Sequence, residues 1–167
     1  MKEVRLFDNR TGEIGVPETL LSFERNDNLL SFSFEAFDSS LNSYSNIHND
    51  KLFNGDVVEV FLDFGDEFYY EFEVAPNGAT FVAKILNRQI IFIDDSFFTA
   101  SASINGNSYK VTMNIDVSKL KHNANIKFNA YRIETKGIKS DYILQALSPT
   151  LCDTFHMREK FIDLFLF

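Results

Sequence analysis

Apolar and polar residues alternate with a period of two along much of the chain. The stretch Leu30–Glu35 places apolar side chains at every second position, as a strand with one buried face requires. The same alternation recurs in Val57–Leu62, Tyr69–Val74 and Tyr109–Asp116. These four segments therefore predict half-buried β-strands rather than helices.

Turn signals lie between these segments. Asn77-Gly78 and Asn105-Gly106 carry the dipeptide that most strongly predicts a tight hairpin. Asn and Ser residues gather at Asp38–Asp50, which predicts a loop, and only Val117–His122 has the pattern of a helical turn, with Ser118 as its expected cap. Many short strands, regular turns and little helix predict an all-β fold, an antiparallel two-sheet β-sandwich that is jelly-roll-like and of immunoglobulin size.

Length and charge narrow the classes of protein to consider. The 167 residues fit one domain, so we expect a single domain over residues 1–167. The formal net charge of −8 argues against a nucleic acid or an anionic membrane as the partner, because both attract basic surfaces. The first residues lack an apolar signal segment and Cys152 is the sole cysteine, which favours a cytoplasmic protein unless a secretion signal has been removed.

Five stretches, taken in order, resemble a known family. They are Leu30–Asp38, Phe53–Asp63, Tyr69–Gly78, Tyr109–Leu120 with Phe128–Glu134, and Phe155–Leu164. Together they resemble the family 9 carbohydrate-binding modules, which are β-sandwich domains attached to bacterial polysaccharide-degrading enzymes. The resemblance implies non-catalytic binding of a saccharide ligand, with no chemistry carried out by this chain.

The resemblance also implies which residues bind the sugar. Phe53 and Phe155 match the two aromatic platforms that hold the sugar ring in the family, where the residue is usually Trp. The polar contacts to the hydroxyls fall on five further residues: Glu59, Glu73, Asn129, Tyr131 and Arg132. This chain has nineteen Phe and no Trp, so a second hypothesis stays open: a structural or protein-interaction sandwich that has lost the sugar site.

Arg132 carries an independent signal. It lies in phase with Ile126, Phe128 and Ala130, on the face of the expected strand that is apolar. Arginine is rarely buried without a partner. Pairing with a glutamate could be purely structural or could form part of a polar site, and the sequence leaves both open.

Other chemistries have weaker support. Glu59, Glu71 and Glu73 share one face of neighbouring strands, but a glycosidase needs two carboxyls at a defined separation. The resemblance favours a non-enzymatic role over that alternative. Cys152 has no recognisable base motif and is expected to be a bystander.

No cofactor is expected, and calcium is the one candidate metal. Oxygen ligands for calcium could come from Asp63–Glu67 or Asp94-Asp95. His48, His122 and His156 show no metal-ligand spacing. Haem ligation by His156 with the adjacent Met157 is disfavoured because neighbouring residues on a strand point to opposite faces, and the alternative ligand, Met113, alternates with core positions.

Two apolar segments raise the question of self-association. Phe161–Phe167 is apolar at almost every position, which is typical of a central strand covered on both faces. Ile90–Ile93 has the same character. At the edge of a sheet, such a strand would favour a homodimer.

Overall fold

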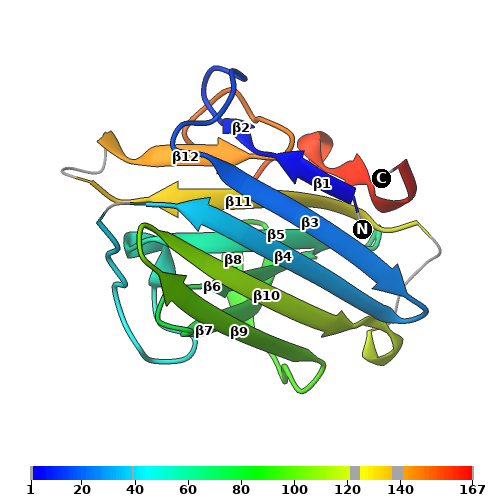
Figure 1. Ribbon diagram of the computed structural model, residues 1–167. Helices are drawn as coiled ribbons and strands as arrows, with labels where there is room; N and C mark the ends of the chain where they lie inside the picture. The colour runs from blue at the N-terminus through cyan, green and yellow to red at the C-terminus, as the bar shows by residue number, and fades with distance from the viewer. Residues whose placement is uncertain (1, 39, 121–124, 137–140, 167) are drawn as a thin grey trace.

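The computed structural model describes residues 2–38, 40–120, 125–136 and 141–166, and it confirms the predicted two-sheet sandwich. Figure 1 shows one antiparallel sheet lying in front of the other. Among the described residues the front sheet contains, in spatial order, β1 (Lys2–Arg5), β3 (Thr19–Asn26), β4 (Leu29–Phe37), β10 (Ser108–Asp116) and β9 (Phe98–Asn105). The back sheet contains, in spatial order, β2 (Phe7–Asp8), β12 (Ile143–Ala146), β11 (Lys127–Glu134), β5 (Val57–Asp63), β6 (Tyr69–Val74), β7 (Thr80–Leu86) and β8 (Gln89–Phe92), with β13 (Ile162–Asp163) beside β11.

The main core lies between the two sheets and is rich in phenylalanine. Phe32, Phe34, Phe72 and Phe128 are at most 2% exposed. The ring of Phe32 on the front sheet meets that of Phe128 on the back sheet, with centroids 5.7 Å apart. Facing sheets about 10 Å apart need such apolar bulk on both inner faces, which accounts for much of the unusual phenylalanine content.

A second buried cluster covers the outer face of the back sheet, and this outer cluster positions the candidate site. Its residues are Leu52, Val57, Phe61, Tyr69, Ala75, Phe81, Ala83, Ile85, Tyr131, Ile133, Leu144, Ala146, Phe155 and Phe161. The 3-10 turn η1 (Leu52–Asn54) and the segment around Phe155 lie over the sheet and contribute to it. The central strands of the back sheet are therefore covered on both faces, as the uniform burial of β5 and β6 shows.

Both predicted Asn-Gly hairpin turns are present. Asn77-Gly78 lies between β6 and β7, and Asn105-Gly106 joins β9 to β10. Gly78 and Gly106 have φ angles of 87° and 59°, in the left-handed region that glycine adopts without steric cost. The sequence therefore identified these turns correctly.

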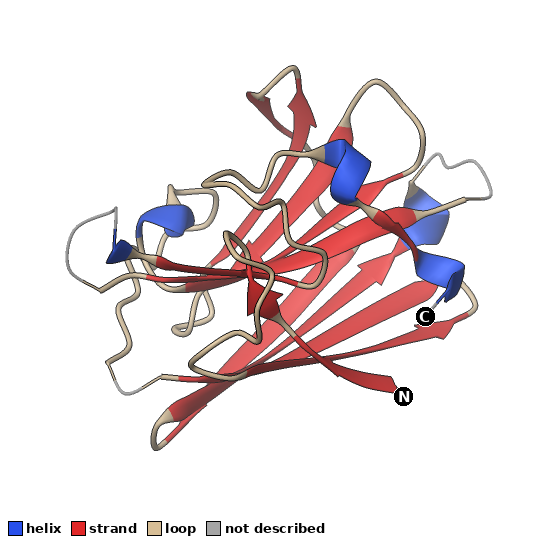
Figure 2. Cartoon of the chain, turned by 90° about the horizontal axis from the view of Figure 1, so that it is seen from above, coloured by secondary structure: helices blue, strands red, loops and turns tan. Residues whose placement is uncertain are grey.

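Helical structure among the described residues is confined to short 3-10 turns, which Figure 2 shows in the connections. The expected turn after β10 is η2 (Val117–Lys119), but its cap differs from the prediction. The Asp116 carboxylate, not the Ser118 hydroxyl, accepts a bond from the Ser118 amide at 3.1 Å. His122 lies outside the described residues. No helix in the described ranges is long and apolar enough to cross a membrane.

The expectation of a long central strand at Phe161–Phe167 is wrong. Among the described residues of this segment only Ile162 and Asp163 pair, with β11, and the chain then forms the 3-10 turn η5 (Leu164–Leu166). Phe167 lies outside the described residues. The segment divides its side chains between two cores: Phe161 joins the outer cluster and Leu164 the main core. That division, rather than burial on both faces of a strand, explains why the segment is so apolar.

Candidate functional site

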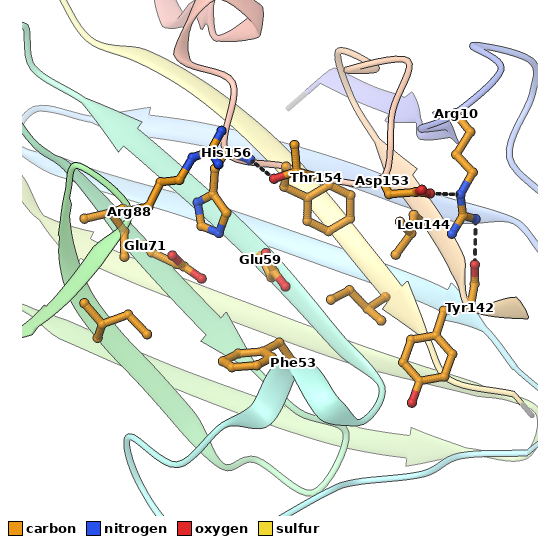
Figure 3. A pocket seen from close by; sticks show the side chains of 14 residues that line it. Arg10, Phe53, Glu59, Glu71, Arg88, Tyr142, Leu144, Asp153, Thr154 and His156 are labelled. Carbon is orange, nitrogen blue, oxygen red and sulfur yellow. Dashed lines mark hydrogen bonds and ion pairs between the residues drawn. The ribbon is translucent and has the colours of Figure 1, made fainter. Parts of the chain in front are cut away.

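A cavity of about 710 Å³ lies on the outer face of the back sheet, and Figure 3 shows its side chains. It is lined by Arg10, Phe53, Glu59, Glu71, Ile85, Arg88, Ile90, Ile133, Tyr142, Leu144, Asp153, Thr154, Phe155 and His156. These residues come from strands β5 to β8, β11 and β12 and from five separate connections. Its volume falls in the range of small-molecule sites, roughly 300–1,000 Å³.

Two phenylalanines form aromatic walls. Phe53 belongs to η1, is partly buried and packs against the outer cluster. Phe155 stacks on Tyr131, with ring centroids 4.2 Å apart and planes 17° apart, and the Tyr131 hydroxyl donates to the Phe155 carbonyl at 3.0 Å. Phe155 is held in place by this double contact and is only 7% exposed, yet it lines the same cavity as Phe53.

Three carboxyls lie together at the base of the cavity. We call Glu59, Glu71 and Glu73 the carboxyl cluster; they are 2%, 5% and 0% exposed. Glu59 on β5 is directly opposite Glu73 on β6, and Glu71 lies two residues before Glu73 on the same face. Glu59 and Glu71 line the cavity itself, where Figure 3 shows their carboxyls directed inward. Glu73 is beside them on the sheet and is not one of the lining residues.

The carboxyl cluster has no positive partner among the residues that the structure describes. Within the described residues none of its members forms an ion pair, and both carboxyl oxygens of Glu73 are buried without a hydrogen-bond partner. Burial raises the pKa of Glu71 to about 7. The pKa values of Glu59 and Glu73 are raised well above the ordinary range, first by burial and then by the neighbouring carboxyls. Near neutral pH, the cluster therefore holds protons that exposed glutamates would have lost.

Charged side chains also surround the mouth of the cavity. Arg10 is held on one side, donating to the Asp153 carboxylate at 2.5 Å and to the Tyr142 carbonyl at 2.8 Å. Arg88 is exposed on the turn between β7 and β8, where Figure 3 shows it extending toward His156. Both Asn87 and Arg88 have positive φ angles, 50° and 65°, as in a tight two-residue hairpin turn. This backbone conformation sets the position of the Arg88 Cα atom at the mouth of the cavity.

His156 completes the wall beside Phe155. Its Nδ1 is 2.5 Å from the Tyr69 hydroxyl, and its ring stacks on Phe61 with centroids 5.4 Å apart. Burial, with a smaller contribution from Arg88, lowers the pKa of His156, so the ring is neutral near pH 7. A neutral imidazole has one donor and one acceptor nitrogen, which suits a ligand rich in hydroxyls.

The fold has counterparts among solved structures, although no family model matches the chain and no curated protein is significantly similar to it. A proposed carbohydrate-binding protein from Bacteroides uniformis superposes with a TM-score of 0.80 at 18% identity, covering 96% of this chain and 84% of that one. A family 9 carbohydrate-binding module from Caldicellulosiruptor kristjanssonii superposes in complex with cellotriose, with a TM-score of 0.61 at 18% identity, over 86% of this chain and 71% of that one. A family 9 module from the same organism in complex with glucose gives 0.59 at 20% identity, over 86% and 72%.

The chain has a family 9-like fold. This finding confirms the fold that the sequence resemblance implied. At identities of 20% or less it establishes the architecture, and the roles of individual residues must be argued from their surroundings in this structure.

Within this family 9-like fold, five of the seven residues suggested by the resemblance lie at or directly under the cavity. Phe53, Glu59 and Phe155 line it. Glu73 lies opposite Glu59 on the neighbouring strand, and Tyr131 supports the ring of Phe155. The predicted aromatic pair and three of its polar companions are thus brought together by elements far apart in sequence.

Asn129 has a different place. Its side-chain amide donates to the Ser148 carbonyl at 2.8 Å, and its carbonyl oxygen accepts from the amides of Ser148 and Ala130. The residue is fully buried. Its polar groups hold the chain after β12 against β11, so they are not directed to the cavity.

Arg132 is not in the site, which corrects the assignment taken from the family. It lies on the inner face of β11, opposite to Tyr131, and is fully buried. Its guanidinium donates to Glu134 at 3.1 Å, to Asp38 at 3.4 Å and to the Thr19 hydroxyl at 2.9 Å. Of the two interpretations that the sequence left open, the structural ion pair is the one present.

The first acidic loop proposed for calcium already contains a positive charge. The Arg158 guanidinium binds both carboxylate oxygens of Asp63, at 2.6 and 2.9 Å, and the carbonyls of Asp66 and Glu67 at 2.7 and 3.3 Å. Those four oxygens are the ligand type that calcium prefers. Arg158 therefore occupies the position that a cation in this loop would take.

The remaining candidate ligands are dispersed. Asp95 pairs with His48 at 3.1 Å, and Met113 is fully buried in the main core, on the opposite side of the back sheet from His156. The Cys152 sulfur lies 3.3 Å from that of Met157. Across the described ranges, no group of three or more His, Cys, Asp or Glu side chains is arranged to hold a metal.

Sequence reasoning missed the mouth of the cavity. Arg10, Arg88, Tyr142, Asp153 and His156 lie in connections or at their borders, where hydrophobic alternation carries no information. The dipeptide Asn87-Arg88 between two apolar segments was the one usable local signal, since Asn favours the left-handed conformation that such a turn requires.

Proposed function

We propose that this chain is a non-catalytic carbohydrate-binding domain whose saccharide ligand lies in the cavity on the outer face of the back sheet. One observation carries the proposal: Phe53 and Phe155 line the same cavity, and Glu59 and Glu71 form its base. Aromatic walls with a few convergent polar groups are the usual composition of a small-molecule site.

The chemistry of these side chains suits a sugar. The C–H faces of a pyranose ring pack on aromatic rings, while its hydroxyls both donate and accept hydrogen bonds. A carboxyl with a pKa near neutrality, as in Glu71, can serve either as donor or as acceptor. Phenylalanine offers less area than tryptophan and no N–H donor, so we expect weak, reversible binding.

The similar structures support the proposal. Two of them are family 9 modules in complexes with cellotriose and with glucose. We therefore choose glucose and cellotriose as the first ligands to test, and we expect no turnover of either.

Titration calorimetry with glucose and cellotriose tests the proposal directly. Phe53→Ala should weaken binding at least tenfold, because Phe53 lines the cavity and is only partly buried. Phe165→Ala is the matched control, since that ring is 57% exposed and belongs to η5, away from the cavity. Equal affinities for the Phe53 variant and the wild type, or heat-free titrations across a wider panel of sugars, would overturn the proposal.

One observation favours a second candidate, self-association. Strand β8 ends the back sheet in the described part of the chain, and it exposes Ile90, Ile91 and Phe92 at 47%, 41% and 56%. An exposed apolar edge strand is a template for pairing with another chain. We propose antiparallel pairing of β8 with β8 of a second copy, tested by light scattering of the wild type and of Ile91→Lys. A wild type that is monomeric at high concentration would exclude it.

A further inference from the structure

The carboxyl cluster is larger than hydrogen bonding to a neutral sugar requires. Three carboxyls, each at least 95% buried, lie on one face of two neighbouring strands without a basic partner. Resting on the proposed function, we propose that the cavity prefers a saccharide bearing an ammonium group, that is, a non-acetylated amino sugar, over the corresponding neutral sugar. The ammonium would bind between Glu59 and Glu71.

The titratable side chains packed against the cluster are neutral, so a ligand would have to supply the positive charge. Tyr69 and Tyr131 lie on the same face, and burial raises the pKa of both hydroxyls, so both are neutral. His156 is also neutral near pH 7, because burial lowers its pKa. In the part of the chain that the structure describes, no side chain next to the cluster therefore supplies a positive charge at its base.

The arginine side chains nearest to the cluster either form ion pairs with other carboxylates or lie at the mouth of the cavity. Arg10 is paired with Asp153, and Arg158 binds both oxygens of Asp63. Arg88 is exposed on its turn. Solvent screens an exposed charge strongly, so Arg88 compensates the buried carboxyls poorly.

An entering ammonium would change the state of the cluster. Opposite charge favours the ionised form of a carboxyl, and the effect is strongest where water is excluded. Binding of a cationic sugar should therefore release protons from the cluster, whereas a neutral sugar should release few. This proton release distinguishes the proposed contact from simple stacking on Phe53 and Phe155.

The opposite preference, for an acidic sugar, has less support. Arg88 could meet a ligand carboxylate at the mouth, but the base of the cavity would then place Glu59 and Glu71 against a second negative charge. The exposed arginine can move away, while the buried carboxyls are fixed on two central strands. We therefore favour the cationic ligand and keep the acidic one as an outcome of the test.

Calorimetry with glucosamine, glucose, N-acetylglucosamine and glucuronate near pH 7 tests the inference. We expect glucosamine to bind at least about tenfold more tightly than glucose, a difference of about 1.4 kcal/mol. Repeating the titration in buffers of different ionisation enthalpy should show proton release for glucosamine alone. Near pH 5 the preference should shrink, because the cluster is then largely protonated.

Glu71→Gln assigns the preference to the cluster. This variant should lose the preference and bind glucosamine and glucose with similar affinity. Glu24→Gln is the matched control, because Glu24 is exposed on β3 of the other sheet. Thermal melting of both variants checks that they fold.

The outcomes separate the two proposals. Glucose binding without a preference for glucosamine, or tighter binding of glucuronate, would overturn this inference and leave the proposed function intact. A glucosamine preference that survives in Glu71→Gln would also overturn it. If no sugar binds, the proposed function fails together with the inference.

Discussion

Glu59 on β5 lies directly opposite Glu73 on β6, and both carboxyls are buried on the cavity side of the back sheet. Like charges at opposed positions of an antiparallel pair destabilise a sheet. The structure tolerates the pair because burial, and then the neighbouring carboxyls, raise both pKa values and keep protons on the cluster. The carboxyl cluster is therefore tolerated at low pH, where it is protonated. At high pH its ionised carboxylates repel one another and lower the stability of the fold.

The first prediction is a pH-dependent gain in stability for Glu73→Gln. In the unfolded chain these glutamates ionise near pH 4.5, but in the folded protein they ionise later, at about 7 for Glu71. Between these values the folded state holds more protons, so the free energy of unfolding falls as pH rises. Glu73→Gln removes one such carboxyl and should raise that free energy by about 1–3 kcal/mol near pH 8, with little change near pH 4.

Urea unfolding across this pH range provides the measurement. Glu24→Gln, exposed on the other sheet, serves as the control and should follow the wild type at every pH. A gain for Glu73→Gln that is the same at all pH values would contradict the explanation, since it would not arise from ionisation.

The second prediction concerns the support of Phe155. Tyr131→Phe keeps the ring that stacks on Phe155 but removes the hydroxyl that donates to its carbonyl. We expect a loss of about 1 kcal/mol in stability and a few-fold weaker affinity for glucose, because Phe155 is positioned less firmly. Tyr44→Phe, at an exposed tyrosine, should change neither. Unchanged glucose affinity in a destabilised Tyr131→Phe would show that Phe155 does not contact the sugar.

The sequence predicted those parts of the fold that depend on local pattern. Alternation identified β4, β5, β6 and β10, and the Asn-Gly dipeptides identified two of the turns, because in each case neighbouring residues determine the backbone. The last residues were misjudged for the opposite reason: Phe161 and Leu164 are apolar because they reach two different cores.

The site was predicted only in part, and Arg132 shows why. The family resemblance placed Tyr131 and Arg132 in one site, although adjacent residues of a strand point to opposite faces. The apolar phase of Arg132 with Phe128 and Ala130 was the better guide, and the structure confirms it. Residues at the mouth, such as Arg88 and His156, depend on tertiary contacts between distant connections, which no local pattern encodes.

The third prediction concerns calcium. Arg158 already binds Asp63 and two carbonyls in the acidic loop, so millimolar calcium should leave the melting temperature of the wild type unchanged relative to a chelator. Arg158→Gln leaves the largely buried Asp63 without its partner and should lower the free energy of unfolding by about 1–2 kcal/mol, since Arg158 itself is partly exposed. Thermal melts with calcium and with chelator measure both effects, and a calcium-dependent rise in the wild type would contradict the assignment.

The fourth prediction separates stability from binding at Arg132. Arg132→Met removes the charge that pairs with Glu134 and Asp38, and both carboxylates are fully buried. Removing one partner of a buried pair typically costs about 3–5 kcal/mol. Lys136 also pairs with both acids, so we expect the lower end of that range.

Binding should respond differently from stability in this variant. Because Arg132 lies on the inner face of β11, the folded fraction of Arg132→Met should bind glucose with the affinity of the wild type. Urea unfolding gives the loss in stability, and calorimetry at a temperature where the variant is folded gives the affinity. A variant of wild-type stability that no longer binds glucose would return Arg132 to the site, since only contact with the ligand could then explain the loss.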